Sequence, residues 1–326
     1  MKTRTLGKTG FNISEVGFGA WAIGADWGDA VPEDQATAAL HAALDAGMNF
    51  IDTADIYGGG RSETIIGKVL KERPAGERNY VATKMGRGEG WNPTIEDIRR
   101  TAEESCARLG VDSLDLVQLH CIPTETLKAG QVFDHLEAIK GEGLIKHYGV
   151  SVETIEEGLI CIDHGGPATL QVIYNLFRQR LTHQLLPAAA ASNVGIIARV
   201  PLASGVLTGK FSADHNFGEN DHRNFNSDGQ CFNAGETFAG VPFNQGIEFA
   251  DELDNLLGNE CTQAQRALRW ILDHPEVSTV IPGAKNEEQA KGNADAAALA
   301  SFSKETHESV EALYNQKIDQ TVRGVY

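Results

Sequence analysis

Four residues with acid–base side chains, Asp52, Tyr57, Lys84 and His120, are spaced along the first 120 positions. A tyrosine is a weak acid, with a pKa of about 10, but a neighbouring ammonium group lowers that pKa. Such a set can protonate an oxygen on which negative charge develops, or accept a proton from an alcohol. This chemistry suits hydride transfer to and from a carbonyl group.

Each of the four has a distinct place in this hypothesis. Lys84 would be the ammonium beside Tyr57, and Asp52 would keep that lysine charged in an apolar interior. His120 would orient a substrate oxygen and help to pass its proton. Any one of these residues, taken singly, is more often structural, because Asp commonly bonds its own backbone in loops. Their shared position, at or just beyond the ends of apolar segments, favours the functional interpretation.

A regular alternation of short apolar segments and amphipathic helices must position these residues. Nearly continuous apolar strands indicate a parallel sheet that is buried on both faces, and eight such units favour a (β/α)8 TIM barrel over an open sheet. We therefore predict a single barrel domain over residues 1–326. The eight strand-like segments are 16–20, 49–54, 80–84, 114–120, 147–151, 169–175, 195–201 and 278–284.

Two further segments lie outside the repeat. Residues 1–14 alternate around a Gly-Lys-Thr-Gly turn, which predicts a β-hairpin that plugs the bottom of the barrel. Residues 209–245, after the seventh strand, are rich in Asn, Gly and Phe and predict a long irregular loop. Loops of this length are usually functional lids or disordered.

Composition excludes several classes of function. The formal net charge of −17 opposes binding to nucleic acid or to an anionic membrane through a general positive field, but a local basic pocket is compatible with it. The chain shows neither a secretory leader nor a transmembrane stretch, so we expect a cytoplasmic protein. Its five cysteines contain no CxxC pair, and no HExxH motif is present, so we predict neither disulfides nor a metal site.

Eight sequence segments, in order and spacing, resemble the aldo-keto reductase superfamily, particularly its bacterial general aldo/keto reductase branch. The resemblance covers almost the whole chain. It implies that Tyr57 is the general acid, that Lys84 and Asp52 tune it, that His120 orients the substrate, and that NADPH or NADH supplies the hydride. The segments are GFGAW, NFIDTADIYGGGRSE, VATKMG, LDLVQLH, YGVS, QVIYN, RVPLASGVLTGKF and VIPGAKNEEQ.

The resemblance also places the nicotinamide at the barrel mouth. It implies that Ser151 and Gln171 bond the carboxamide. Arg199 stands where many family members have an aromatic residue that stacks on the nicotinamide, and a guanidinium plane can also stack on a ring. Val152 stands where the family usually has Asn, which removes one amide contact.

Two further segments are expected to hold the rest of the cofactor. Glycines in 201–210 let backbone N–H groups approach a pyrophosphate, and the candidate residues there are Pro201, Leu202, Gly205, Leu207, Gly209 and Lys210. The resemblance implies an adenosine-phosphate clamp made of Gly283, Lys285, Gln289 and Asn293. The cation at Lys285 favours NADP(H), while NAD(H) stays an alternative.

Substrate and function alternatives remain open at this stage. Trp21 and Trp27 would wall a substrate pocket or pack locally. The first hypothesis is reduction of an aldehyde or ketone, including a sugar-like one, to an alcohol. The alternatives are an NAD-dependent aldose dehydrogenase and a cofactor-sensing regulatory subunit that resembles the potassium-channel β subunits. We expect a small-molecule carbonyl or alcohol substrate, and composition does not indicate an oligomeric state.

Overall fold

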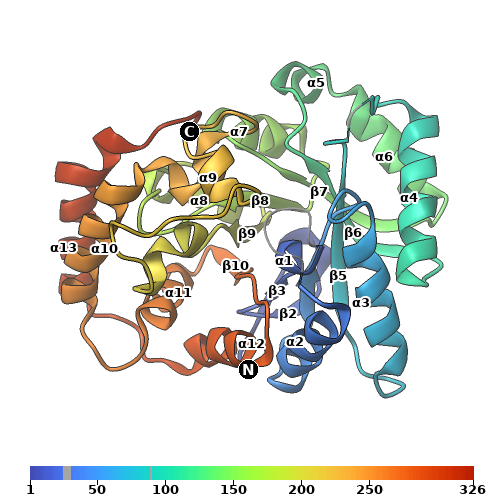
Figure 1. The fold of residues 1–326 in the computed structure, drawn as a ribbon. Helices are drawn as coiled ribbons and strands as arrows, with labels where there is room; N and C mark the ends of the chain where they lie inside the picture. The colour runs from blue at the N-terminus through green and yellow to red at the C-terminus, as the bar shows by residue number, and fades with distance from the viewer. Residues whose placement is uncertain (25–30, 89) are drawn as a thin grey trace.

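Eight parallel strands form the centre of the molecule in the computed structural model, which describes residues 1–24, 31–88 and 90–326. Each strand pairs with the next one along the chain, so that the order in the sheet is the order in the sequence (Figure 1). The strands are β3 (Phe18–Gly19), β4 (Phe50–Asp52), β5 (Tyr80–Met85), β6 (Leu114–His120), β7 (Ile145–Ser151), β8 (Thr169–Ile173), β9 (Gly195–Arg199) and β10 (Val277–Val280).

The first and last strands of this sheet are joined by parallel bridges between Val16 and Val280 and between Gly19 and Gly283. The amide of Gly17 donates to the Val280 carbonyl at 2.9 Å. A Cβ on Gly19 would lie 2.6 Å from a backbone oxygen on the neighbouring segment, so this close approach requires glycine. The sheet thus closes, and the predicted (β/α)8 barrel is confirmed.

Amphipathic helices surround the barrel (Figure 1). In α4, Ile98, Ala102 and Cys106 recur every four residues and are buried, which places one apolar stripe against the strands. Thr154 begins α7 with a capping box that satisfies amides in the first turn. The helices that follow the strands are α2 (Glu33–Asp45), α3 (Arg61–Glu72), α4 (Ile95–Leu109), α6 (Gln131–Gly141), α7 (Ile155–His164), α8 (Leu185–Ala191), α11 (Gln263–Leu272) and α12 (Glu287–Asp295).

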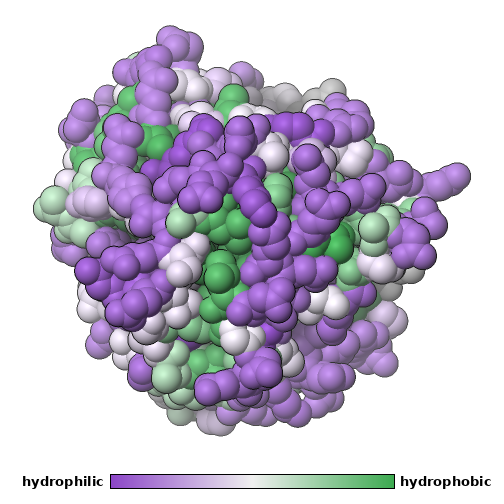
Figure 2. Space-filling view, turned by 90° about the vertical axis from the view of Figure 1, so that its left-hand side faces the viewer, coloured by the Kyte–Doolittle hydropathy of each residue, from purple (hydrophilic) through white to green (hydrophobic). Residues whose placement is uncertain are grey.

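Additional helices decorate this framework. The short helices are α1 (Trp21–Gly24), α5 (Thr124–Ala129) and α9 (His222–Phe225), and the longer ones are α10 (Phe243–Leu257) and α13 (Lys304–Leu313). The face that carries α10 and α13 is mostly hydrophilic, and its hydrophobic residues form separate small areas (Figure 2). Within the part of the chain that the structure describes, no helix combines the length and the apolar character needed to cross a membrane.

The N-terminal hairpin closes one end of the barrel, as predicted. Strands β1 (Thr3–Thr5) and β2 (Asn12–Ser14) pair antiparallel and are joined through a 3-10 turn at Gly7–Thr9. Leu6 and Ile13, both fully buried, pack against side chains from five strand segments inside the barrel: Phe50, Ala82, Leu116, Ile197 and Ile281. Burying one such aliphatic side chain stabilises the fold by about 1.5–3 kcal/mol.

The segment 209–245 is largely irregular, as predicted, with α9 and short 3-10 turns within it. Aromatic side chains anchor it to α10: the ring centroids of Phe217 and Phe238 lie 5.3 and 5.0 Å from that of Phe243. Arg323, near the C-terminus, donates to the Gly240 carbonyl at 3.1 Å. The long loop is therefore packed against the body of the protein.

Candidate active site

The predicted acid–base residues converge at the carboxyl ends of three adjacent strands. Asp52 is the last residue of β4, Lys84 lies in β5 and His120 ends β6. Because parallel neighbours bring their carboxyl ends to the same edge, these side chains share one rim. Tyr57 reaches this rim from the turn after β4, where three consecutive glycines with positive φ lead into α3.

The ammonium of Lys84 is the centre of this group. Its Nζ donates to Asp52 Oδ1 at 2.5 Å, to the Thr53 carbonyl at 2.8 Å and to the Tyr57 hydroxyl at 3.1 Å. An ammonium has three N–H donors, so all three are used. Lys84 is 1% exposed, and this burial fixes its position relative to the phenol.

The electrostatic surroundings keep Lys84 charged and Tyr57 protonated. Desolvation lowers the pKa of Lys84, but the attraction of Asp52 and Tyr57 outweighs it, so that the pKa is raised. Desolvation raises the pKa of Tyr57 more than Lys84 lowers it. This corrects the expectation from sequence, which considered only the ammonium. The phenol therefore holds its proton until charge develops on a nearby oxygen.

The second carboxylate oxygen of Asp52 is held by two amides. Gln118 Nε2 donates to Asp52 Oδ2 at 3.2 Å, and Gln171 Nε2 donates to the same atom at 2.6 Å. The amide nitrogen of Gln171, a predicted cofactor ligand, is thus engaged within the acid–base group. Sequence reasoning missed Gln118, although strand alternation places it on the same face as His120, two residues later.

His120 is buried beside the phenol, with 4% of its surface exposed. The ring centroids of Tyr57 and His120 lie 6.0 Å apart in an edge-to-face arrangement. Desolvation, together with Lys84, Arg87 and Arg199, lowers the pKa of His120 well below its ordinary value. The imidazole is therefore neutral at physiological pH and can orient a carbonyl oxygen without itself carrying charge.

Two strand ends beside the acid–base group turn through left-handed backbone. Cys121, directly after β6, has φ 53°, and Val200, directly after β9, has φ 54°. A positive φ is a marked outlier for a β-branched residue, and such strain clusters at functional sites. The turns bring Arg199 Nη2 to 3.6 Å from Cys121 Sγ, which also lies 3.6 Å from Ser151 Oγ. Ser151 and Arg199, two predicted cofactor ligands, thus lie on the same rim.

The loop after β9 contains the residues predicted to contact a pyrophosphate. Its backbone is left-handed at Ala203, Ser204, Gly205 and Gly209. Successive amides in such turns form concave nests that bind anions. Pro201 and Leu207 are buried, Leu202 is half-buried, and Lys210 is exposed beyond the turn.

The residues predicted to bind adenosine phosphate lie together where β10 leads into α12. The amide of Lys285 donates to Gln289 Oε1 at 2.8 Å, and Asn293 Nδ2 donates to the Gly283 carbonyl at 3.2 Å. The Asn286 side chain caps α12 by accepting a hydrogen bond from the backbone N–H of Gln289. Lys285 and Gly283 are exposed, so the cation is accessible at a helix N-terminus, where anions are favoured.

Of the two tryptophans predicted to wall a substrate pocket, the structure describes only Trp21. Trp21 lies in α1, and its ring packs edge-to-face against His222 of the long loop, with centroids 4.6 Å apart. The structure thus connects the loop after β3 to the long loop. Trp27 lies outside the described residues.

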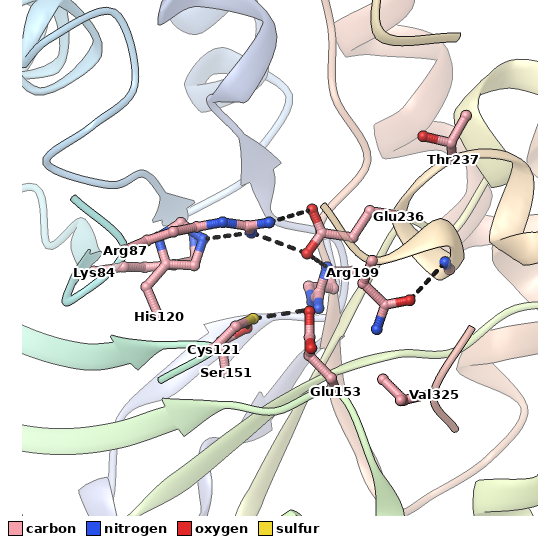
Figure 3. A network of polar contacts seen from close by, with 12 residues as sticks. Lys84, Arg87, His120, Cys121, Ser151, Glu153, Arg199, Glu236, Thr237 and Val325 are labelled. Atoms are coloured by element: carbon pink, nitrogen blue, oxygen red, sulfur yellow. Dashed lines mark hydrogen bonds and ion pairs between the residues drawn. The ribbon is translucent and has the colours of Figure 1, made fainter. Parts of the chain in front are cut away.

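Sequence reasoning missed an ionic network over His120. Arg87, three residues after Lys84, and Arg199 both contact the carboxylate of Glu236, which the long loop supplies (Figure 3). Arg199 was a candidate from its sequence position, but no local pattern marks Arg87 or Glu236, because they are 149 positions apart and meet only through the path of the long loop.

His222 gives the loop a dependence on pH. Burial lowers its pKa to about 4, whereas an unfolded histidine titrates near 6.5. The unfolded state therefore takes up a proton first as pH falls, and stability is lost below about pH 6.5. We expect His222 to lower the free energy of unfolding by about 2 kcal/mol at pH 5 relative to neutral pH. The free energy of unfolding, measured in urea at pH 7 and at pH 5, should change less between the two pH values for His222→Gln than for wild type. His183 is exposed, so the control variant His183→Gln should resemble wild type.

Comparisons with known proteins agree with this geometry. The sequence profile of the Aldo/keto reductase family matches residues 15–315. A probable voltage-gated potassium channel subunit beta from Oryza sativa subsp. japonica is 29% identical, over 98% of this chain and 99% of that protein.

Solved structures of similar proteins extend over nearly the whole chain. The glycerol dehydrogenase of Gluconobacter oxydans superimposes with a TM-score of 0.77 and 29% identity, and the match covers 99% of this chain and 98% of that one. An aldo-keto reductase from Klebsiella pneumoniae, solved in complex with NADPH, has a TM-score of 0.73 and 25% identity, with 99% of each chain covered.

Proposed function

Since this chain belongs to the aldo/keto reductase family, we propose that it is an NADP(H)-dependent oxidoreductase that reduces an aldehyde or ketone to an alcohol. One observation carries this proposal: the Lys84 ammonium contacts both the Asp52 carboxylate and the Tyr57 hydroxyl in a buried site. This arrangement joins a protonated phenol to a fixed positive charge, as a general acid requires.

The protein side of the reaction is a proton transfer. The Tyr57 hydroxyl donates its proton to the carbonyl oxygen as negative charge develops there, and the ammonium 3.1 Å away stabilises the phenolate that remains. Asp52 and its two amide partners hold the ammonium in place. His120, neutral and beside the phenol, orients the carbonyl oxygen. The nicotinamide cofactor, when bound, supplies the hydride.

The residues at the barrel mouth fit a nicotinamide dinucleotide. Arg199 Nε is buried and has no hydrogen-bond partner among the described residues, so the guanidinium retains a donor for a ligand. The left-handed turn at 203–205 would bind the pyrophosphate, and Lys285 would bind the adenosine phosphate. The Klebsiella relative, which was solved with NADPH, supports the choice of cofactor.

A second candidate is oxidation of a hydroxylated or sugar-like alcohol by the same site. The similarity to a glycerol dehydrogenase favours it, because the reverse reaction uses the same proton path. A third candidate, a cofactor-sensing regulatory subunit, is favoured by the potassium-channel relative. The dehydrogenase would differ from the reductase in the direction of turnover and in its use of NAD⁺, whereas the regulatory subunit would bind the cofactor without turnover.

Titration with NADPH and NADH, followed by nicotinamide fluorescence, tests the proposal together with a turnover panel of small aldehydes and aldoses. Tight binding with turnover of aldehydes would support the reductase. Oxidation of aldoses with NAD⁺ alone would favour the dehydrogenase. Binding without turnover of any carbonyl or alcohol would favour the regulatory subunit, and a failure to bind either cofactor would refute all three.

Lys285→Ala should weaken the binding of NADPH about 5- to 10-fold and leave NADH binding unchanged, because only NADPH carries the additional phosphate. Both dissociation constants follow from the fluorescence titration. Lys291→Ala is the matched control, since Lys291 lies in α12, the helix that follows Lys285, and its ammonium donates to Glu287 Oε2 at 3.2 Å. An equal loss of affinity for both cofactors in Lys285→Ala would argue against a contact with the phosphate.

A further inference from the structure

A carboxylate of the protein itself is bound by two arginines beside the acid–base group. Glu236 lies in a 3-10 turn, Ala234–Glu236, of the long loop. Arg87 binds it in a two-point manner, with Nη1 2.9 Å from Oε1 and Nη2 3.1 Å from Oε2. Arg199 Nη1 lies 3.2 Å from the same Oε1. Figure 3 shows the carboxylate between the two guanidinium groups.

This site holds the Glu236 carboxylate between two largely buried guanidinium groups. The side chains of Arg199, Glu236 and Arg87 are 11%, 13% and 24% exposed. Burial raises the pKa of Glu236, but Arg199 and Arg87 outweigh it and lower the pKa, so the carboxylate is ionised. Two guanidinium groups this close together repel one another, and an anion between them offsets that repulsion.

The arginine pair lies beside the reacting atoms. Arg87 Nη1 is 3.5 Å from Nε2 of His120, the side chain expected to orient the carbonyl oxygen. With ordinary hydrogen-bond lengths at both ends, a carboxylate on Arg87 and a carbonyl oxygen on His120 would lie no more than about 9 Å apart. A short-chain carbonyl compound can span this distance.

We propose that Arg87 and Arg199 recognise a carboxylate group of the carbonyl substrate, and that Glu236 holds this place as an internal stand-in when no such substrate is bound. The inference rests on the proposed function, whose substrate class it specifies as short-chain oxo acids. Exchange of one carboxylate for another leaves the charge of the site unchanged. The tethered Glu236 competes with substrate, because its loop keeps it at a high effective concentration.

A metal ion is the rival explanation of these acidic groups. Ligand atoms of Cys121, Glu153 and Glu236 lie within 4.8 Å of one another. However, Arg199 already contacts Cys121 and Glu236, so that a guanidinium supplies the positive charge that a metal ion would bring. The arginine pair therefore accounts for the geometry without a metal.

The test compares 4-oxobutanoate with its methyl ester, a neutral aldehyde of similar shape. Wild type should have at least about 10-fold higher kcat/KM for the acid, and Arg87→Met should reduce this preference about 10- to 100-fold, since a two-point ionic contact is lost. Arg99→Met is the matched control, because Arg99 binds Glu142 in the same two-point manner on the outer helices. It should keep the preference of wild type.

Glu236→Gln separates competition from a merely structural ion pair. We expect a KM for 4-oxobutanoate several-fold lower than in wild type and a smaller change for the ester, because the neutral amide no longer competes. Equal changes for acid and ester, or an Arg87→Met variant that keeps the acid preference, would overturn the inference.

The reductase activity and the carboxylate site can be tested separately. Turnover of the ester without any preference for the acid would leave the reductase intact and remove the carboxylate site. If neither aldehyde is reduced, the proposed function fails. Calorimetric titration with 4-oxobutanoate still shows whether the arginine pair binds a carboxylate. Binding that Arg87→Met abolishes would support the site, while no binding to wild type would refute it.

Discussion

Tyr57→Phe should lower kcat by about 10²-fold or more while cofactor affinity stays near that of wild type, as expected for the loss of a general acid. The substitution removes only the hydroxyl, which lies 3.1 Å from Lys84 Nζ, and leaves the ring that packs beside His120. Steady-state kinetics with a neutral aldehyde and a fluorescence titration with NADPH give the two quantities.

Tyr148→Phe is the matched control for this variant. Tyr148 is another buried tyrosine, but its ring packs against Phe133 of α6, away from the acid–base group. Loss of the Tyr148 hydroxyl should leave kcat unchanged. Near-normal kcat in Tyr57→Phe would refute the assignment of the general acid, whereas an equal loss in both variants would point to a general effect on the fold.

Lys84→Met should abolish most activity and also destabilise the protein by about 3–5 kcal/mol, because it leaves a buried carboxylate without its ion-pair partner. Lys84 and Asp52 are 1% and 3% exposed, so water cannot replace the lost ammonium. The pKa of Tyr57 would rise further, since Lys84 is the group that lowers it. Turnover and urea unfolding measure the two effects.

A double variant separates the two roles of Lys84. In Asp52→Asn/Lys84→Met the buried charge is removed, so stability should recover in part, while turnover should stay lost because the ammonium is still missing. A Lys84→Met variant that only raises KM would indicate that the lysine positions substrate. Recovery of turnover in the double variant would show that the ammonium is not required.

Much of the fold followed from periodicity. The eight apolar segments all contain strands in the predicted order, since a parallel sheet buried on both faces leaves a nearly continuous apolar signal. Their extents were less well predicted: residues 16–20 contain only the two-residue strand β3, and 169–175 end as a strand at Ile173. Beyond that point, Asn175 bonds the Val200 carbonyl instead of continuing the ladder.

The sequence by itself determined the barrel and the rim on which Asp52, Lys84 and His120 meet, because the carboxyl ends of parallel strands share one edge. Only the tertiary structure decided which side chains cover that rim. Arg87 and Glu236 meet through a long loop with no periodic signal. The tertiary structure also decided the direction in which the pKa of Tyr57 shifts. Desolvation depends on every element packed around the phenol, whereas the spacing of residues in the sequence shows only the nearest charge.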